Sequence, residues 1–487
     1  MSKKHFIAIE DGVSPCQVLQ RGADDRVDIH FAGSTTVPNG TEVEARLLRF
    51  GQPMSDFPWS GIGLVEGGAF DGLVSGVPAG GPYALEVRAV EKEAVLAAGA
   101  CAGILVGDLW MLAGQSNMEG CGRLDAPEVE EPTPLVHAFD MSDRWLIACE
   151  PLHWRVDSVD AAHWPGPRKP TEEEALLYHR DRPTGVGPGL AFAREIVRHT
   201  AVPIGLVPCA VGGTSMDQWS PARVKLGGKS LYGAMLRRFG AVGSRVKGVL
   251  WYQGESDAAP GLVDNYAAKF SQFVKGLRRD FEQPNLPVLS VQIGRIFVPH
   301  PTHLDWNGVQ ETQRKCAEKI RNTDMVPAVD LTMDDHVHVS TAGQKRLGER
   351  LAVVALRRVY GWENLKVGPR LESVELKPDD TVRVRYREVN SRLLPLGEVS
   401  GFSVRDAKAR DLSLIYKAQV DPEALDTVVL SLKEHVPAGA FLWYGFGPAP
   451  FCNLTDELDM GAPVFGPRLL RKEDRSAASG IHASRAE

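Results

Sequence analysis

The first hundred residues alternate between hydrophobic and polar positions with a period of two. In the run 27–31 three hydrophobic side chains alternate with Asp28 and His30, and the run 85–89 repeats the pattern. Such alternation is typical of antiparallel strands that bury one face. Turn sequences at 38–40 and 79–82 separate the runs. We therefore predict an N-terminal β module over residues 1–100, built as a β-sandwich.

From residue 101 the pattern changes to continuous apolar runs separated by amphipathic stretches. The runs predict buried strands at 104–106 with 109–112, 203–207, 247–252, 287–293 and 325–331. The clearest helical stripe consists of Tyr266, Phe270, Phe273, Leu277 and Phe281. Strands that alternate with helices favour a parallel α/β sheet, which we place at residues 101–365.

A Pro-rich, charged insertion interrupts this order at about residues 120–186. It carries side chains that suit either the faces and hydroxyls of a sugar or the packing of the insertion itself, namely His153, Trp154, His163, Trp164 and Arg168. We expect the insertion to shape a surface over the sheet.

The alternation of polar and apolar positions returns after about residue 366. In the run 382–387, three apolar side chains alternate with arginines, as in a strand with one face exposed to solvent. We predict a second β-sandwich-like module over residues 366–465. The polar sequence that follows predicts a disordered tail over residues 466–487.

The net charge of the chain argues against two classes of binding partner, nucleic acids and membrane surfaces. The 487 residues include 55 Lys and Arg against 62 Asp and Glu, which gives a formal net charge of −7. A mildly acidic chain argues against a dedicated nucleic-acid binder, which would show a basic stripe. It argues equally against a polybasic membrane-surface protein. We therefore expect neither nucleic acid nor membrane as a partner.

The N-terminal sequence and the cysteines indicate a compartment. The apolar stretch after Lys3-Lys4 ends at Glu10, which is too short for the hydrophobic region of a signal peptide. The uncharged run 94–107 has 14 residues, short of the roughly 18–20 that span a bilayer. The 7 cysteines are scattered without a CxxC pair, which suits a reducing compartment. These features predict a cytoplasmic protein.

Four polar, glycine-rich segments follow the predicted parallel strands, at residues 113–118, 211–219, 253–257 and 334–338. In an open parallel sheet, ligands bind beyond the carboxyl ends of the strands. We therefore expect the four segments to converge on one edge of the sheet, where the site would lie.

Taken singly, each segment has an ordinary structural interpretation. A serine in a tight turn can cap a helix, paired glycines can form a turn, and polar residues often fill loops. A histidine beside a helix start can be structural. The residues concerned are Ser116, Gly212-Gly213, Gln253 and His338, the last of which precedes a capping box predicted at Thr341 and Gln344 and a helix that buries Leu347, Leu351 and Val354.

The chemistry that the segments support together is acyl transfer. A serine hydroxyl is a weak nucleophile until an imidazole accepts its proton, and the imidazole needs a carboxylate to fix its tautomer. Ser116, His338 and Asp335 are the candidates, with Asp335 three residues before His338. The oxyanion of the intermediate needs preorganised donors. The N–H groups of Ser116 and Gly213, with the side-chain amide of Gln253, can provide three.

Several stretches carry a resemblance to a known family. They are 106–118 (VGDLWMLAGQSNM), 212–219 (GGTSMDQW), 251–257 (WYQGESD) and 335–338 (DHVH). In this order they resemble the nucleophile, second, third and Asp-x-x-His blocks of the sialate O-acetylesterase-like branch of the SGNH (GDSL-type) hydrolases. Residues 79–85 and 443–454 resemble the β modules that flank the catalytic unit in this family. The resemblance covers most of residues 15–465.

The resemblance implies a flavodoxin-like α/β hydrolase domain between two β-sandwich-like modules. It implies Ser116 as nucleophile, His338 as base and Asp335 as the acid that orients the base. It implies a carbohydrate O-acetylesterase that acts on an O-acetylated carbohydrate and uses no cofactor and no metal.

The resemblance also implies an oxyanion hole made by the Ser116 N–H, a glycine N–H of the second block and Gln253. Gln253 stands where the wider group has an asparagine. We expect Gly213 rather than Gly212 to be the glycine donor. The doubled Asp334-Asp335 and the second histidine, His336, leave the register of the Asp–His pair open.

The sequence therefore predicts a carboxylic ester hydrolase that deacetylates a carbohydrate through an acetyl-serine intermediate. Two alternatives stay open. One is a metal-dependent hydrolase that uses His336 and His338 with Asp334 or Asp330, although no HExxH motif or second histidine cluster completes a zinc site. The other is a catalytically silent glycan-binding protein supported by its β modules.

Overall fold

The computed structural model describes residues 5–297 and 303–471. The chain forms two compact units, each assembled from several segments. Unit 1 consists of Met1–Gln253, Lys269–Leu289 and His338–Ala352, and unit 2 consists of Gly254–Ala268, Ser290–Val337 and Val353–Glu487. The division therefore differs from the predicted sequence of consecutive domains, because the chain passes repeatedly from one unit to the other.

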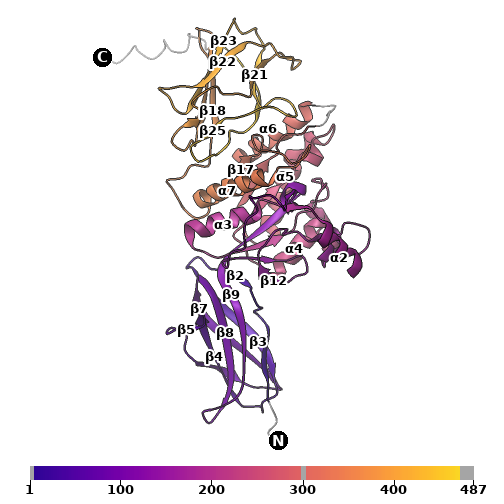
Figure 1. Ribbon diagram of the computed structural model, residues 1–487, viewed down its shortest axis with the longest axis vertical. Helices are drawn as coiled ribbons and strands as arrows, with labels where there is room; N and C mark the ends of the chain where they lie inside the picture. The colour runs from indigo at the N-terminus through magenta and orange to yellow at the C-terminus, as the bar shows by residue number, and fades with distance from the viewer. Residues whose placement is uncertain (1–4, 298–302, 472–487) are drawn as a thin grey trace, which may run out of the picture. The chain divides into compact units, whose positions relative to one another are not determined.

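The N-terminal part of unit 1 consists of antiparallel strands (Figure 1). One sheet has the order β1-β3-β7, and in the other β4 pairs with β5, β6 and β8. Alternate side chains of β8 are buried, and they join a cluster with Phe31, Val43 and Phe70. The strands are β1 (Ile7–Asp11), β3 (Arg26–Thr35), β4 (Glu42–Arg49), β5 (Gln52–Pro53), β6 (Ser60–Leu64), β7 (Ala69–Pro78) and β8 (Gly80–Glu91).

Strand β9 (Ala94–Gly114) runs from these antiparallel strands into the central sheet. Its first half pairs antiparallel with β8, and residues 105–107 pair in parallel with β2 (Val18–Gln20). Its last residues pair in parallel with β14 (Ile204–Pro208) and β15 (Gly248–Tyr252). The boundary that we predicted between residues 100 and 101 thus falls inside one continuous strand.

The central sheet of unit 1 has the order β12-β11-β14-β9-β15-β16. Strands β11, β14, β9 and β15 are parallel to one another, and β12 joins the edge in the antiparallel sense. The predicted α/β class is confirmed, and the sheet is mixed rather than purely parallel. The remaining strands are β11 (Val136–Phe139), β12 (Trp145–Ile147) and β16 (Val288–Gln292), whose first two residues belong to unit 1.

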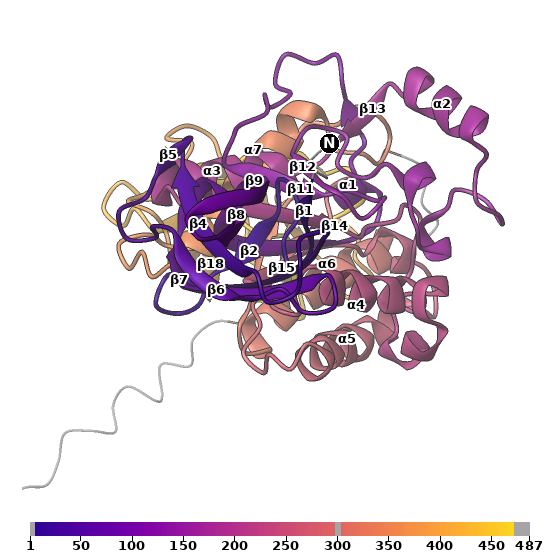
Figure 2. The same cartoon turned by 90° about the horizontal axis from the view of Figure 1, so that it is seen from below.

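Helices cover both faces of the central sheet. Figure 2 shows α3 (Gly189–Thr200) on one side, and α4 (Leu231–Ala241) and α5 (Tyr266–Asp280) on the other. On the α3 side, the ring centroids of Phe192 and Trp110 are 4.9 Å apart. On the α5 side, those of Phe273 and Trp251 are 4.3 Å apart. Every side chain of the helical stripe predicted at 266–281 is buried, so that prediction is confirmed.

The insertion at 120–186 contributes two strands to the central sheet, which the sequence did not lead us to expect. Strand β11 occupies the position beside β14. Its four residues are all buried, but so short a run shows no periodicity. The other elements of the insertion are β10 (Gly122–Arg123), η1 (Arg155–Asp157), η2 (Ala161–His163), α2 (Glu172–Asp181) and β13 (Thr184–Val186).

Unit 2 contains the end of β16, the strand β17 (Thr323–Pro327) and helix α6 (His303–Lys319). Ser290 of β16 donates from Oγ to the backbone carbonyl of Asp324 in β17 at 3.0 Å. The strand predicted at 325–331 is wrong over residues 328–331. A turn closed by the Leu331 N–H and the Ala328 carbonyl, 3.3 Å apart, ends β17, although the apolar run continues.

The C-terminal part of unit 2 is rich in β-strands, as predicted. One sheet has the order β18-β19-β23-β22, another β21-β24-β26, and β20 pairs with β25. The side chain of the buried Gln292 in β16 bonds to both backbone groups of Val464, at 2.8 and 3.0 Å. The strands are β18 (Arg370–Leu376), β19 (Thr381–Arg387), β20 (Leu393–Leu394), β21 (Phe402–Arg405), β22 (Ile415–Val420), β23 (Thr427–Leu432), β24 (Phe441–Tyr444), β25 (Thr455–Asp456) and β26 (Phe465–Leu469).

The prediction that residues 466–487 form a disordered tail is wrong at its start. Strand β26 extends to Leu469, which pairs with Phe441 of β24. Leu470 is buried as well, because it packs with the apolar core of the C-terminal strands. Residues 472–487 lie outside the described residues.

Candidate active site

The carboxyl ends of three neighbouring strands lie level in the central sheet. Tyr252 of β15 pairs with Gly114 of β9, and Pro208 of β14 pairs with Leu112 of β9. At Gly114 φ is 135°, and a Cβ would lie 2.1 Å from the Tyr252 carbonyl oxygen, so only glycine allows this approach. The segments that follow the three strands therefore start at one edge of the sheet.

Ser116 is the first residue of a one-turn helix, α1 (Ser116–Glu119), that begins directly after β9. Its Oγ lies 3.0 Å from Nε2 of His338. This is the distance at which an imidazole can accept the hydroxyl proton. The structure thus brings together the serine and the histidine that the sequence predicted as a pair, although they are 222 residues apart in the chain.

The residues that follow Ser116 and His338 are hydrogen-bonded to each other. Asn117 is buried, and its Oδ1 accepts the Val339 N–H at 3.0 Å. Gln344 donates from Nε2 to the backbone carbonyl of Asn117 at 3.1 Å. These bonds hold the backbone next to Ser116 against the backbone next to His338. We did not predict a role for Asn117 from the sequence, because no local pattern points to a partner so far along the chain.

The capping box predicted at Thr341 and Gln344 is wrong. Helix α7 (Thr341–Arg358) follows Ser340, whose Oγ accepts the Gly343 N–H at 3.2 Å. Thr341 instead donates from Oγ1 to the backbone carbonyl of Arg123 at 2.8 Å, and the Gln344 side chain points to Asn117. The apolar face predicted for this helix is confirmed, since Leu347, Leu351 and Val354 are buried.

Glu119 holds the second segment, residues 211–219, close to Ser116. Its Oε2 accepts the Gly212 N–H at 2.6 Å, and a Cβ on Gly212 would lie only 3.4 Å from the Cβ of Ser116. Gly213 has φ +70° and faces open space. Its N–H donates to no acceptor in residues 5–297 and 303–471. Of the two glycines, Gly213 is therefore the one whose N–H is available.

Two arginines of the insertion surround the Glu119 carboxylate. Arg155 Nη1 lies 3.5 Å from Oε2, and Arg182 Nη2 lies 3.4 Å from Oε1. The Glu119 side chain is only 8% exposed, and a carboxylate so buried needs opposite charges and hydrogen-bond donors. We did not predict a role for Glu119 from the sequence. Its signal is the spacing from Ser116, which puts the two residues one helical turn apart.

Gln253 is the first residue after β15 and is completely buried. Its Nε2 donates to the backbone carbonyl of Thr214 at 3.1 Å, which ties the third segment to the second. A glutamine amide carries two protons and can donate to two acceptors.

Asp335 and His336 belong to unit 2, and both are exposed. Oδ1 of Asp335 accepts the Val337 N–H at 2.8 Å, and the His336 carbonyl accepts the Phe297 N–H at 2.7 Å. Unit 1 therefore assembles Ser116, Gly213, Gln253 and His338. The pairing of Asp335 with His338 stays a prediction.

Two histidines of the insertion are buried and cannot contact a sugar. Of the two roles that we considered for these side chains, sugar binding and packing of the insertion, packing is the one that the structure supports for them. His153 is 1% exposed, and burial with the nearby Arg182 and Arg238 lowers its pKa to about 3. His163 is also buried, and its Nδ1 lies 2.9 Å from Ser158 Oγ. Trp164, by contrast, is half-buried and lines a hollow of about 320 Å³ beside Gly212 and Gly213.

Neither a metal centre nor a membrane span is found in the part of the chain that the structure describes. No three His, Cys, Asp or Glu side chains among residues 5–297 and 303–471 are grouped to hold a metal ion. Over the same residues, no helix has the length and apolar character needed to cross a membrane.

A family model described as carbohydrate esterase, sialic acid-specific acetylesterase, matches residues 106–357, more than half of the chain. The chain belongs to this family. It is therefore a carboxylic ester hydrolase, and both the family resemblance and the enzyme class inferred from the sequence are confirmed. The matched residues include Ser116 and His338, the pair at the edge of the central sheet.

Similar proteins have been described in plants, animals and bacteria. A probable carbohydrate esterase of Arabidopsis thaliana is 30% identical over 268 residues, which are 50% of this chain and 88% of that protein. Human sialate O-acetylesterase is 24% identical over 311 residues, 56% of this chain and 57% of the human protein. A carbohydrate acetylesterase from Xanthomonas citri shares the fold, with a TM-score of 0.64, 23% identity and coverage of 93% of this chain and 98% of its own.

Proposed function

We propose that this enzyme is a serine esterase of the SGNH type that removes O-acetyl groups from a carbohydrate through an acetyl-serine intermediate. The observation that carries the proposal is the 3.0 Å distance between Ser116 Oγ and His338 Nε2. Family membership supports the hydrolysis of esters on carbohydrates. The names of the human and Xanthomonas citri proteins support acetyl as the acyl group.

In the first half of the reaction, Ser116 Oγ bonds to the acetyl carbonyl carbon while its proton passes to His338 Nε2. The carbonyl oxygen becomes an oxyanion, for which the N–H groups of Ser116 and Gly213 and the amide of Gln253 are the proposed donors. Collapse of this intermediate breaks the bond to the sugar oxygen. That oxygen takes the proton from His338, and the sugar leaves as an alcohol.

In the second half, water attacks the acetyl-serine and gives its proton to His338. The oxyanion forms again at the same donors. Its collapse breaks the bond to Ser116 Oγ, which takes the proton from His338, and acetic acid departs and ionises to acetate in solution. Throughout, Nε2 must accept and return a proton, so Nδ1 must carry a hydrogen and needs an acceptor. Asp335, three residues before His338, is the proposed acceptor.

The test is acetate release from a panel of O-acetylated sugars by the wild-type enzyme and by Ser116→Ala. We expect the variant to lose several orders of magnitude in kcat and to keep the wild-type unfolding midpoint. A fluorophosphonate probe should label Ser116, which mass spectrometry of the digested protein would locate. Labelling of Ser215 or Ser256 instead would contradict the assignment.

The two alternatives give different outcomes in the same assay. Activity that is lost with a chelator and restored by zinc would support the metal-dependent hydrolase. Binding of glycans without turnover of any activated acetyl ester would support the silent binding protein. Rates on p-nitrophenyl esters that rise with chain length would point to a lipid esterase, because a lipase-like cleft gains about 0.8 kcal/mol for each buried CH₂.

A further inference from the structure

We propose that unit 2 carries a second carbohydrate site, which binds a neutral oligosaccharide through residues that take no part in ester hydrolysis. Its basis is a hollow of about 640 Å³, within the range of roughly 300–1,000 Å³ that is usual for ligand pockets. Every residue that lines this unit-2 hollow belongs to unit 2. Ser116, Gly213, Gln253 and His338 belong to unit 1, so binding in the hollow does not depend on the roles proposed for them.

One face of α6 forms a wall of the unit-2 hollow. Leu304, Gly308, Thr312 and Lys315 line it, and residues spaced three and four apart lie on the same side of a helix. A Cβ on Gly308 would lie 2.9 Å from Cγ2 of Val263 in η5 (Val263–Asn265). The glycine therefore lets η5 pack closely on α6, and the two elements present Leu304 and Val263 as apolar parts of the wall.

Strand β24 contributes two aromatic side chains to the unit-2 hollow. Phe441 and Trp443 both line it, because alternate side chains of a strand point to the same face. Trp443 is only 6% exposed. A Cβ on Gly466 of β26, where φ is +141°, would lie 2.4 Å from Cε3 of Trp443. The backbone of β26 thus packs against the indole and holds it in place.

Two polar groups in these walls are available to a ligand. The indole Nε1 of Trp443 donates to no acceptor in residues 5–297 and 303–471, and the half-buried Thr312 hydroxyl forms no hydrogen bond over the same ranges. An indole N–H that is nearly buried usually finds a hydrogen-bond partner. A ligand hydroxyl in the hollow can accept from Trp443, and the Thr312 hydroxyl can both donate and accept.

The turn that carries Lys408 is formed before any ligand binds. Oδ1 of Asp406 accepts the N–H groups of Lys408 and Arg410, each at 2.9 Å. Oδ2 of Asp406 accepts Nε of Arg410 at 2.7 Å, and Arg405 donates from Nη1 to the Ala409 carbonyl at 2.9 Å. A turn held by its own hydrogen bonds loses little freedom when Lys408 contacts a ligand, which reduces the entropy cost of binding.

The charges in the unit-2 hollow balance one another. Glu311 is paired with Lys315 at 3.2 Å, and Asp406 is engaged within its own turn. Asp264 and Lys408 also line the hollow, and both are exposed. Neither forms an ion pair with a residue that the structure describes. One free carboxylate and one free ammonium group leave no net charge to attract an ion.

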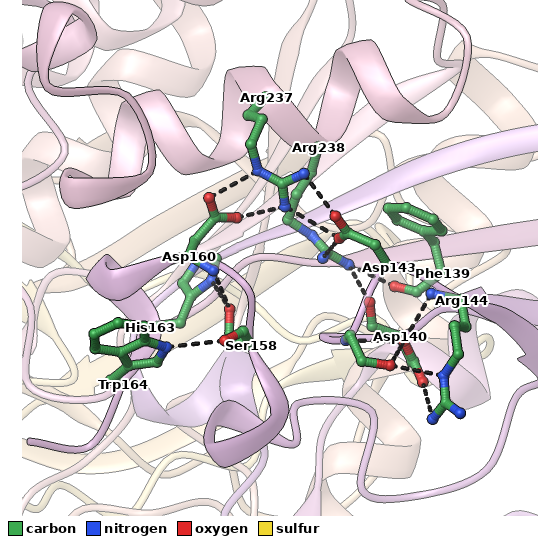
Figure 3. Close-up of polar contacts among 11 residues, drawn as sticks. Phe139, Asp140, Asp143, Arg144, Ser158, Asp160, His163, Trp164, Arg237 and Arg238 are labelled. Atoms are coloured by element: carbon green, nitrogen blue, oxygen red, sulfur yellow. Dashed lines mark hydrogen bonds and ion pairs between the residues drawn. The ribbon is translucent and has the colours of Figure 1, made fainter. Parts of the chain in front are cut away.

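The free charges of the unit-2 hollow differ from the charged cluster of the insertion in unit 1, which Figure 3 shows. There Arg237 of α4 binds both oxygens of Asp160 at 2.7 Å and reaches Asp143 at 2.6 Å. Arg238 adds a bond of 2.8 Å to Asp143. Both carboxylates of that cluster are engaged without a ligand, whereas those of Asp264 and the ammonium group of Lys408 are not paired.

A neutral sugar matches the groups of the unit-2 hollow better than an ion does. Sugar hydroxyls donate and accept, so they can bond to the Asp264 carboxylate and to the Lys408 ammonium group. The apolar face of a sugar ring can pack on Phe441 and Leu304. An anion would be attracted by Lys408 but repelled by Asp264, and a cation would meet the reverse. Membership of a carbohydrate esterase family makes an oligosaccharide the neutral ligand to expect.

The test is isothermal titration calorimetry of the full chain with unacetylated tetrasaccharides of β-1,4-linked glucose, xylose and mannose. Wild type should bind at least one of them. Asp264→Ala should raise Kd for that sugar about tenfold and Thr312→Val about threefold, because a hydrogen bond to a charged group contributes more than a neutral one. The double variant should bind about 30-fold more weakly, the product of the two effects. Every variant should keep the wild-type kcat/KM on p-nitrophenyl acetate.

Asn265→Ala is the matched control, since Asn265 is the exposed neighbour of Asp264 in η5 and does not line the hollow. It should leave Kd unchanged. Unfolding midpoints show whether each variant is folded. If Thr312→Val unfolds, Asp264→Ala decides the question, because it changes an exposed side chain. Raising the salt concentration should leave the wild-type affinity unchanged, because the ligand carries no charge for salt to screen.

Wild type that binds none of the three sugars would overturn the proposed site. An unchanged Kd in the double variant would overturn it as well, because the sugar would then bind elsewhere. Tighter binding of a galacturonate tetrasaccharide, with an affinity that falls as salt rises, would contradict a neutral ligand. Ser116→Ala should bind the neutral sugar like wild type. Failure of the proposed hydrolysis would therefore leave this binding intact, and absence of the binding would leave the hydrolysis intact.

Discussion

Glu119 determines where the Gly212–Gly213 turn lies relative to Ser116. One carboxylate oxygen accepts the Gly212 N–H at 2.6 Å, and the pairing with Arg155 and Arg182 fixes the orientation of the carboxylate. The position of the proposed oxyanion donor at Gly213 therefore depends on a side chain that takes no part in the chemistry. We therefore expect Glu119 to be a positioning residue.

Replacing Glu119 tests that dependence. Glu119→Ala should lower kcat on p-nitrophenyl acetate by about 10²-fold, comparable to the loss of one oxyanion donor, because the turn can move away from Ser116. Glu119→Gln keeps an oxygen that can accept the Gly212 N–H and should recover much of the rate. Steady-state kcat and KM measure both effects. Equal losses in the two variants would mean that Glu119 acts through the charge of the arginines and not through the glycine.

Gln253 is expected to act on the transition state rather than on the bound substrate. Gln253→Ala should lower kcat by about 10²–10³-fold with KM nearly unchanged, since an oxyanion donor interacts most strongly with the developing charge. The side chain also bonds to the Thr214 carbonyl at 3.1 Å, so the unfolding midpoint of the variant serves as the control. A rise in KM alone would make Gln253 a specificity residue.

At the scale of elements, the insertion combines buried histidines with ion pairs, and this makes its stability sensitive to acid. The pKa of His153 is lowered to about 3 by burial and by Arg182 and Arg238. Burial also lowers the pKa of His163 well below its usual range. In the unfolded chain both rings take up a proton below about pH 6.5, whereas the folded protein excludes it. Stability is therefore present above that pH and falls as the pH drops toward 3.

We expect the urea midpoint of the wild-type protein to fall between pH 7 and pH 5, with each buried histidine adding up to about 1.4 kcal/mol per pH unit. His153→Leu should make this dependence shallower because it removes one of the two titrating groups. His30→Gln, which changes an exposed histidine of β3, is the matched control. A slope that is the same in His153→Leu and wild type would show that other groups cause the acid sensitivity.

The sequence predicted those elements whose own residues carry a periodic signal. The apolar runs identified β14, β15 and β16, and the stripe at 266–281 identified α5. Strand β11 was missed because four buried residues between polar, Pro-rich stretches give no period. Strand β17 was placed too late, because the apolar run continues past Pro327 through a turn. In both cases the apolar residues are buried, as their pattern predicts. Burial alone does not distinguish a strand from a buried turn.

The residues of the candidate site also include some that the sequence predicts and some that it does not. Ser116, His338 and Gln253 follow predicted strands or precede a predicted helix, so the position of each could be inferred from the chain around it. Asn117 and Glu119 act through bonds to Val339 and Gly212, at separations of 222 and 93 residues. The spacing of Glu119 from Ser116 indicates only that the two residues lie one helical turn apart. No local sequence pattern contains the distant partners Val339 and Gly212, so the folded structure is needed to reveal both roles.

At the scale of the whole molecule, the C-terminal strands share a core with the end of the α/β region inside unit 2. Val329 belongs to the same apolar cluster as Val384, Leu430 and Phe465. Gln292 of β16 also satisfies the backbone groups of Val464, the residue before β26. The C-terminal strands are therefore part of the structure of unit 2 and not an appended module.

We therefore expect that a chain ending at residue 365 does not fold stably, although we predicted a separate catalytic domain that ends there. It would expose the apolar surface around Val329 and leave Oε1 of the buried Gln292 without the Val464 N–H that it accepts, and an unsatisfied buried polar group costs about 1–3 kcal/mol. Circular dichroism and urea unfolding of the shortened and full chains would measure this. Cooperative unfolding of the shortened chain at the wild-type midpoint would show that residues 366–471 contribute nothing to unit 2.

The separation of 222 residues between Ser116 and His338 sets a delay during synthesis. At about 5–20 residues per second, the ribosome needs roughly 10–45 s to add the histidine after the serine. During that time the growing chain already contains β9 and the proposed nucleophile but lacks the proposed base, without which a serine hydroxyl is weakly reactive. From the proposed mechanism we expect esterase activity to begin only late in translation, once α7 has emerged and Val339 can bond to Asn117.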